Sequence, residues 1–307
     1  MTSISFAVDQ AGAATQPDAA ARHGVCSGVC HGTLGELIQG PYLEGGTAQI
    51  SLISLPVRKY SCMHFTPHGA GPGDGLAAKT KCRLAIGHYL ALHGRQLPAG
   101  CWTHDSELLE GKGMASSTAD IVATIRCLDA LFGIESQDAA IAAILGRIER
   151  SDSVFLDSYA LYLSGRQQVV RRFGRTPAFH VCYIDEGGRV DTERVGSHLL
   201  GWYRDRLDAY LDNLEAAVGA FARGDAARIA ACATASAVLG QPAIPKRNLD
   251  LLLRHQARHG ADGVFVAHTG SLLGYLYIEP PAPARLGALS AFFRGLGYRA
   301  WFAQTGF

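Results

Sequence analysis

The sequence predicts an α+β fold in two parts, on three observations. Short β-like runs fill the stretch from Gly24 to Thr66, and the second half opens with the most regular helix of the chain. Strand-like and helix-like segments intermix without the steady βαβ alternation of a doubly wound sheet. At 307 residues the chain can bury a sizeable core. We expect a disordered tail at 1–23, a β-rich and α N-terminal part at 24–187, and an α/β C-terminal part at 188–307.

Six strands are expected before the second part, at Thr47–Leu55, Val57–Phe65, Cys101–His104, Tyr159–Leu163, Gln168–Phe173 and Phe179–Ile184. Pro56 is expected to break the first two apart, because proline cannot donate to a strand ladder. Apolar residues at helical spacing predict helices at Leu76–His93, from about Ala115 to Phe132, and at Ser136–Arg150. The second part is expected to hold helices at 225–239, 249–259 and 284–295, and strands at 263–267, 274–278 and 298–303. A connector between the two parts is expected near Asp185–Ser197.

Composition and charge exclude several classes of protein. Lys+Arg 28 against Asp+Glu 27 leaves a net charge of +1, which gives no basic surface for nucleic acid. The chain lacks the run of about 18 apolar residues that spans a membrane, and Met1–His23 does not read as a secretory signal. The eight cysteines form no CxxC, and Cys26, Cys30 and His31 lie in a strand-like stretch rather than a metal knuckle. A soluble cytoplasmic protein is the expectation.

The segment from Glu110 to Asp120 carries the strongest signal for a ligand site. Glycines let the backbone approach a ligand, and small and hydroxyl residues that open a helix direct free amides at an anion, typically phosphate. The spacing does not fit a P-loop, because Ser106 stands where GxxxxGK[ST] needs its first glycine. A simple helix start after a flexible turn remains the alternative. The candidate nucleotide-binding residues are Gly111, Lys112, Gly113, Met114, Ala115, Ser116, Ser117 and Thr118.

Three weaker motifs accompany this segment. Glu36 lies between apolar residues in a glycine-flanked strand, so it either faces solvent or is buried with a partner. Glu149 and Asp152, at positions i and i+3, could serve as metal ligand and base, although a charged helix end is the commoner explanation. The turn Thr269–Ser271 lies between two apolar strands and could be only a hairpin.

Together the motifs resemble the GHMP small-molecule kinases. Gly35-Glu36 resembles their first motif, Gly111-x-Gly113-x-x-Ser116-Ser117-x-Ala119 their phosphate loop, and Thr269-Gly270-Ser271 their C-terminal turn. The resemblance runs from about Gly28 to the end. It is closer to the L-threonine kinase branch, associated with cobalamin synthesis and propanediol utilisation, through residues 35–40, 111–120 and 185–192. Met114-Ala115 departs from the usual Leu-Gly, no proline precedes the loop, and the last motif lacks its string of glycines.

The resemblance implies a GHMP-kinase-like two-part fold and an ATP- and Mg²⁺-dependent kinase that converts L-threonine, or a related hydroxy amino acid, to its O-phosphate. It places Ser117 (or Ser116) and Glu149 at Mg²⁺ and Asp152 as the base, with Asp157 as its rival, and Lys112 could add a mobile charge. The implied substrate-binding residues are Glu36, Gln39, Gly40, Thr269, Gly270 and Ser271. Homoserine or a natural-product intermediate as acceptor, or a non-catalytic GHMP-fold binding protein, are the alternatives. The sequence leaves a homodimer open.

Overall fold

The computed structural model describes residues 24–68, 75–188 and 199–307. The tail expected at 1–23 and most of the expected connector lie outside these residues. The strands are β1 (Cys26–Glu44), β2 (Thr47–Pro67), β3 (Gly100–Ser106), β4 (Tyr159–Leu163), β5 (Gln168–Gly174), β6 (His180–Asp185), β7 (Gly263–Val266), β8 (Leu272–Tyr277) and β9 (Trp301–Gln304). The helices are α1 (Thr80–His93), α2 (Ser116–Phe132), α3 (Asp138–Leu145), α5 (Leu207–Arg223), α6 (Ala226–Gly240), α7 (Leu249–His255) and α8 (Pro283–Gly295).

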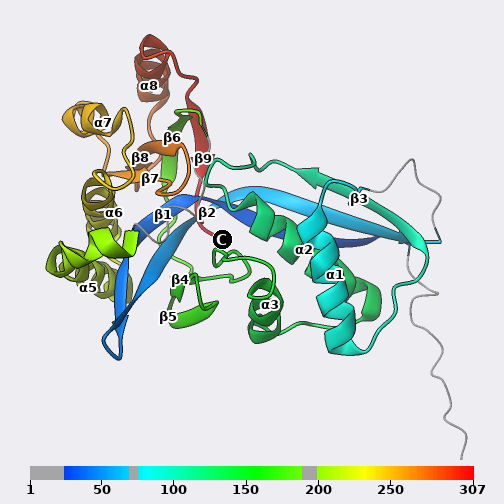
Figure 1. Cartoon of the computed structure of the whole chain (residues 1–307). Coiled ribbons are helices and arrows are strands. Elements are labelled where there is room, and N and C mark those ends of the chain that lie inside the picture. Colours follow the sequence, from blue (N-terminus) through cyan, green and yellow to red (C-terminus); the bar gives the residue numbers. More distant parts are fainter. Residues whose placement is uncertain (1–23, 69–74, 189–198) are drawn as a thin grey trace, which may run out of the picture.

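A long antiparallel hairpin, β1 with β2, runs through the whole molecule (Figure 1). β2 continues through Pro56, so the expected break there is wrong. Pro56 faces Thr33, where the pairing register of β1 shifts on both sides. Such irregularities are where a strand tolerates a residue without an N–H donor. The two expected strands are therefore one.

The strands form a single sheet in the order β5-β4-β2-β1-β7-β8-β6-β9, with β3 paired to β2. The strand pairings in the described residues are antiparallel, and the helices are interspersed among the strands, so the predicted α+β fold is confirmed. β6, from the expected N-terminal part, pairs with β8 and β9 from the C-terminal part. The boundary at 187/188 stays a prediction within one continuous sheet.

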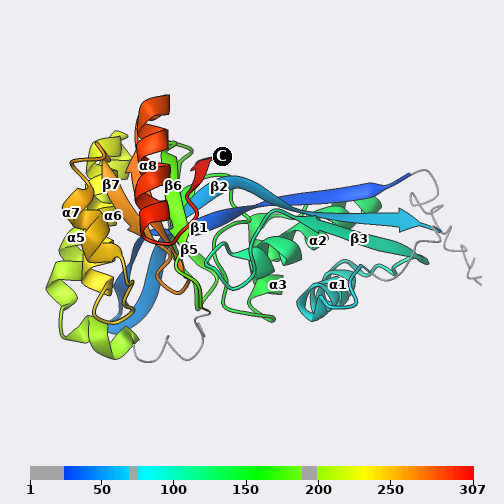
Figure 2. The same cartoon turned by 90° about the horizontal axis from the view of Figure 1, so that it is seen from above.

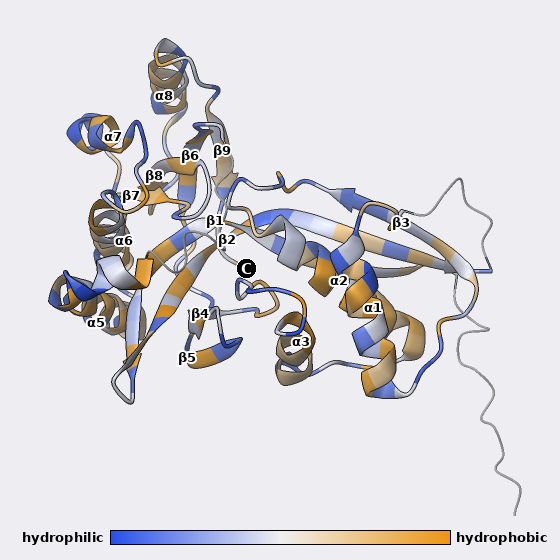
Figure 3. Cartoon of the chain, in the orientation of Figure 1, coloured by the Kyte–Doolittle hydropathy of each residue, from blue (hydrophilic) through white to orange (hydrophobic). Residues whose placement is uncertain are grey.

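Helices cover the two ends of the hairpin separately (Figure 2). α1, α2 and α3 lie along the end with β3, and α5 and α6 lie at the other end. Hydrophobic residues recur along the length of the hairpin in Figure 3. α2 packs so closely on β1 that a Cβ at Gly28 would lie 2.1 Å from the carbonyl oxygen of Ala123. The regular part of α3 is shorter than predicted, because the chain turns after Leu145.

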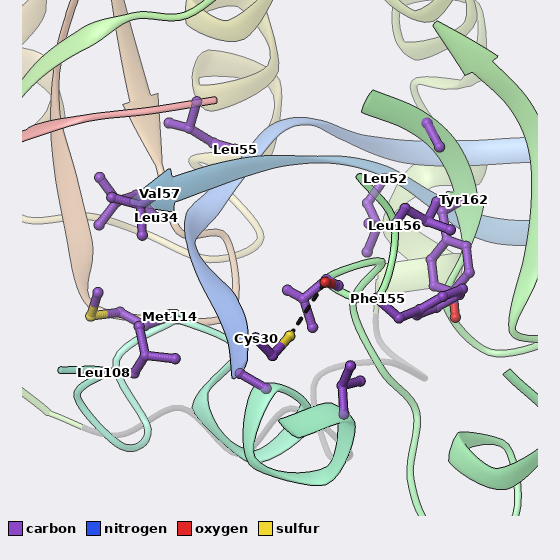
Figure 4. Close-up of a cluster of buried hydrophobic side chains, with 14 of the residues drawn as sticks. Cys30, Leu34, Leu52, Leu55, Val57, Leu108, Met114, Phe155, Leu156 and Tyr162 are labelled. Atoms are coloured by element: carbon purple, nitrogen blue, oxygen red, sulfur yellow. Dashed lines mark hydrogen bonds between the residues drawn. The ribbon is translucent and has the colours of Figure 1, made fainter. Parts of the chain in front are cut away.

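Buried side chains attach the loops of the site to the hairpin. Figure 4 shows Met114, from the phosphate loop, beside Leu108 and close to Leu34 and Val57. In the same core the Cys30 thiol donates to the Val154 carbonyl at 3.4 Å. The segment that carries Asp152 is thereby fixed to β1. No helix within the described ranges has the length and apolar character needed to cross a bilayer.

Candidate active site

The phosphate loop enters α2 as predicted. Gly111, Gly113 and Ala115 have positive φ angles of 70°, 92° and 53°, so the chain makes a tight turn before α2 begins at Ser116. Ala115 stands at the N-cap position, and no side chain caps the helix there. The first amides of α2, and the positive end of its dipole, are therefore available to an anionic ligand.

The three glycine motifs meet at this loop. The Gly35 amide donates to the Gly113 carbonyl at 2.8 Å, and the Ser271 amide donates to the Lys112 carbonyl at 3.1 Å. A Cβ at Gly270 would lie 2.2 Å from that Lys112 oxygen, and a Cβ at Gly35 would lie 2.3 Å from the Cα of Ala267. These contacts leave no room for a side chain, so the glycines hold the motifs together by close backbone approach.

A cavity of about 450 Å³ lies between this loop and the start of α1. Glu110, Gly111, Ser116, Ser117 and Asp120 form its wall on the loop side. The opposite wall consists of Ala78, Lys79, Thr80, Lys81 and Cys82. The start of α2 and two lysines therefore face one space that is large enough for part of a nucleotide.

Glu149 contacts Ser117 and Lys81, two residues that line this cavity. Its side chain is 10% exposed, and its carboxylate accepts hydrogen bonds from Ser117 Oγ at 2.9 Å and Thr118 Oγ1 at 2.8 Å. Lys81 Nζ lies 2.5 Å from the same carboxylate. One carboxylate with hydroxyl oxygens suits Mg²⁺, which proteins commonly hold by one or two carboxylates together with substrate phosphates. Ser117 and Glu149, the residues expected at Mg²⁺, thus lie within hydrogen-bond distance and their oxygens fit the ion, while their role as metal ligands stays a prediction.

Asp152 lies three residues after Glu149 and is partly buried. Burial, followed by the nearby Glu36 carboxylate, raises the pKa of Asp152 to about 7, while Arg150 and the Ser54 hydroxyl oppose the shift. Asp157, the alternative base, is exposed. The environment of Asp152 is the one expected of a functional carboxyl, because perturbed pKa values gather at such sites.

Glu36 is buried with partners, which decides between its two expected states. Its carboxylate accepts from the His268 amide at 3.1 Å and lies 3.2 Å from His268 Nδ1. Lys246 is also buried, and its ammonium donates to the carbonyls of His268 and Gly270 at 3.0 Å and 2.6 Å. Burial lowers the pKa of Lys246 to about 8, against the attraction of Glu36 and Glu186. Glu36 and Lys246 therefore place a buried carboxylate and a buried ammonium group beside His268.

The remaining predicted residues lie around this centre. Gln39 is buried, and its side-chain amide donates to the Tyr203 hydroxyl at 3.0 Å. The backbone amide of Gln39 donates to Ser236 Oγ, and that oxygen lies 3.2 Å from His268 Nε2. Gly40 packs against the ring of Tyr210. Thr269, Gly270 and Ser271 form the turn between β7 and β8.

Lys112 forms an ion pair with the carboxylate of Asp185, which does not line the cavity. Its Nζ lies 2.9 Å from Asp185 Oδ2, while the other oxygen of Asp185 accepts from Ser271 Oγ at 2.5 Å. Burial raises the pKa of Asp185, but the hydrogen bonds from Ser271 and Lys112 outweigh burial and hold the pKa below its usual value. Lys112 therefore ties the loop to β6 and to the C-terminal turn, and its catalytic role stays a prediction.

Sequence reasoning missed Lys79, Lys81 and Lys246 and did not assign His268 a role. A signal existed for the first two, because lysines at the N-terminus of a helix oppose its dipole. Lys79 pairs with Glu110 at 2.7 Å and with Asp120 at 2.8 Å. No comparable local signal marks Lys246, because its partners come from the distant β7–β8 turn.

The comparisons with known proteins agree with this geometry. Residues 82–165 match the GHMP kinases N terminal domain. An L-threonine kinase of Citrobacter freundii is 26% identical over 266 residues, which cover 80% of this chain and 84% of the relative. The mevalonate kinase of Methanococcus jannaschii has a similar structure, with a TM-score of 0.68, 11% identity, and coverage of 93% of this chain and 98% of that one.

The homoserine kinase of Cytophaga hutchinsonii is also similar, with a TM-score of 0.63, 15% identity, and coverage of 91% of this chain and 94% of that one. At 15% and 11% identity, the similarity to these solved structures shows only the fold, and this is the fold that the motifs imply. The chain therefore matches the GHMP kinases over residues 82–165, has the fold of solved GHMP kinases, and is similar to L-threonine kinases over 80% of its length.

Proposed function

We propose that this protein is an ATP- and Mg²⁺-dependent kinase that phosphorylates the side-chain hydroxyl of L-threonine, or of a closely related hydroxy amino acid. The observation that carries the proposal is the grouping of Ser117, Thr118 and Glu149 at the edge of a cavity that the phosphate loop lines. To catalyse phosphoryl transfer, a protein mainly has to position the reactants and neutralise their charge, and this grouping can do both.

The nucleotide phosphates would lie against the loop Gly111–Ser117, with the amides at the start of α2 directed at them. Ser117, Thr118 and Glu149 would hold Mg²⁺. Bound there, the ion would neutralise negative charge on the phosphates. Because the loop is fixed by backbone contacts to Gly35 and Ser271, its amides need little reorganisation when the nucleotide binds.

Asp152 would serve as the general base for the acceptor hydroxyl. The hydroxyl oxygen forms a new bond to the γ-phosphorus, the bond from that phosphorus to the bridging oxygen of ADP breaks, and the hydroxyl proton passes to Asp152. A pKa of about 7 lets this carboxylate accept a proton near neutral pH, where about half of the molecules carry it ionised. Products are the O-phospho amino acid and ADP, and the proton later leaves to solvent.

An amino acid is a suitable acceptor for the region beside Asp152. Glu36 offers a buried carboxylate for an ammonium group, and Lys246 and Arg150 supply positive charge nearby. The similarity to an L-threonine kinase favours threonine. Homoserine is the second candidate acceptor, because the fold is shared with a homoserine kinase. We also propose that the protein is located in the cytoplasm.

An ADP-release assay across acceptors tests this proposal. The purified protein is incubated with ATP, Mg²⁺ and, in turn, L-threonine, D-threonine, L-serine, L-homoserine and mevalonate, and the product is identified by ³¹P NMR. We expect L-threonine to give the highest kcat/KM and a phosphomonoester signal. Preference for homoserine would move the assignment to the second candidate. Release of ADP that no acceptor stimulates would contradict the proposal.

A further inference from the structure

Two lysines stand at the positive end of α1, where cations are unfavourable. Lys79 is the N-cap residue of α1 and Lys81 lies in its first turn, which contains no acidic residue. Both line the same cavity as Ser116 and Ser117. A helix N-terminus disfavours positive side chains, so this arrangement costs free energy unless anions lie opposite. The two lysines differ in how that requirement is met.

Lys79 has fixed partners in the protein. It pairs with Glu110 and with Asp120, whose side chain is 6% exposed and also accepts from Ser61 Oγ at 2.6 Å and lies 2.9 Å from His104 Nε2. Burial raises the pKa of Asp120, but the hydrogen bonds from His104, Lys79 and Ser61 outweigh burial and lower the pKa. Lys79 therefore belongs to a satisfied network in the cavity wall.

Lys81 has a different setting. Its side chain is 51% exposed, and within the described part of the chain its ion pair is to Glu149, 2.5 Å away. The oxygen that receives Lys81, Oε2, also accepts from Ser117 Oγ. The ammonium therefore stands at the carboxylate oxygen and hydroxyl that suit a divalent cation.

Lys81 cannot keep this place when a divalent cation binds Glu149. Mg²⁺ lies about 2.0–2.1 Å from its oxygen ligands, so an ammonium on the same carboxylate oxygen would meet strong repulsion between like charges. The half-exposed, flexible side chain of Lys81 can move, whereas Lys79 is held by two carboxylates. The space that Lys81 can enter is the cavity it already lines, opposite the start of α2.

We propose that Lys81 binds the nucleotide phosphates, and that it pairs with Glu149 only while the nucleotide is absent. This inference rests on the proposed kinase function. The four-carbon stem and point charge of lysine suit a group that changes partners within one site. In the empty site Lys81 neutralises Glu149, and in the loaded site it neutralises phosphate, so neither anion is left unpaired.

Isothermal titration with AMPPNP and Mg²⁺ tests this role without turnover. A charged hydrogen bond to phosphate predicts that Lys81→Met weakens AMPPNP binding about 10- to 100-fold, and that Lys81→Arg restores most of it. Lys59→Met, on β2 and outside the cavity lining, removes the same charge and is expected to leave the affinity unchanged. Thermal melts check that each variant folds, and Lys81→Gln replaces Lys81→Met if the latter does not.

The outcomes separate this inference from the proposed function. If wild type binds AMPPNP and the Lys81 variants bind it equally well with Mg²⁺ present, Lys81 only supports Glu149 and the inference is wrong. If Lys59→Met loses as much affinity as Lys81→Met, the effect is one of net charge and the inference is again wrong. If wild type itself binds no nucleotide with or without Mg²⁺, the kinase proposal fails and the inference fails with it.

Discussion

The hydroxyl of Ser117 lies 2.9 Å from a carboxylate oxygen of Glu149, and thereby joins the start of α2 to the turn that follows α3. Thr118 donates to the other carboxylate oxygen, so both oxygens are held against the same helix end. A carboxylate at a helix N-terminus is stabilised by the dipole. The pairing therefore positions a negative charge rigidly beside the cavity.

Replacing Glu149 by Gln is expected to lower kcat about 10²- to 10³-fold, because it removes one preorganised electrostatic contact at the reacting phosphates. The amide keeps the shape of the side chain, so the protein should fold. Steady-state ADP release at saturating substrates measures the effect. The control is Glu44→Gln at the exposed hairpin tip, where Glu44 pairs with Arg166. A Glu149→Gln enzyme within twofold of wild type would exclude this role.

Asp152→Asn is expected to lower kcat about 10²- to 10⁴-fold, the usual contribution of a general base. KM for ATP should barely change, because the aspartate would contact the acceptor and not the nucleotide. Asp157→Asn is the matched control, since Asp157 is exposed, lies five residues further along the chain and should behave as wild type. If Asp157→Asn abolishes turnover and Asp152→Asn does not, the base is Asp157. If neither matters, the reaction uses no base.

Local patterns predicted most elements of the fold. The strand at Tyr159–Leu163 is correct to the residue, and α2 ends at Phe132 as predicted, before Gly133, whose φ of 64° forms a left-handed cap. The errors arose where tertiary pairing overrides a local signal. Pro56 reads as a strand break, yet an irregularity in the partner strand accommodates it. Helical spacing continues past Leu145, but regular α3 ends there.

The site was predictable only as separate motifs. Glycine and hydroxyl residues mark the phosphate loop because backbone approach and helix starts demand those residue types. The Lys81–Glu149 pair joins residues 68 positions apart, and Lys246 reaches the β7–β8 turn from the α6–α7 loop. No spacing rule links such residues. Folding into one sheet brings them together, so only the structure reveals which charges compensate which.

Gly35→Ala should disrupt the junction of the three motifs. Gly35 has a φ of 77°, and a Cβ there would lie 2.3 Å from the backbone of Ala267. Gly46→Ala is a matched control, because its φ is 78° but nothing lies within 4 Å of the added Cβ. Left-handed backbone alone should cost Gly46→Ala about 1–2 kcal/mol. We expect Gly35→Ala to cost clearly more in urea denaturation; equal losses would show that crowding at Ala267 is unimportant.

The pH dependence of catalysis should report the ionisation of Asp152. A base acts only when deprotonated, so kcat/KM for the acceptor should fall about tenfold per pH unit below pH about 7. Above that pH the profile should flatten. The comparison is Asp152→Asn, whose residual activity should lack this acid limb. An acid limb of the same position in Asp152→Asn would assign the titration to another group.

The free energy of unfolding should also depend on the ionisation of Asp152, and the sign of that dependence follows from the raised pKa. Because the pKa of Asp152 is raised from its ordinary 3.8 to about 7, the folded state binds an extra proton between these values. The unfolding free energy contributed by this group therefore falls as pH rises from about 4 to about 7, and is constant outside that window.

Asp152→Asn removes the penalty of burying the charge. Relative to wild type it should gain roughly 2–4 kcal/mol between pH 4 and pH 8, with solvent screening of a partly exposed group setting the lower figure. Urea denaturation at several pH values measures this, and Asp157→Asn should track wild type throughout. A difference between wild type and Asp152→Asn that does not change with pH would mean that Asp152 is charged in the fold at no cost. The carboxyl would then lack the raised pKa that qualifies it as a base.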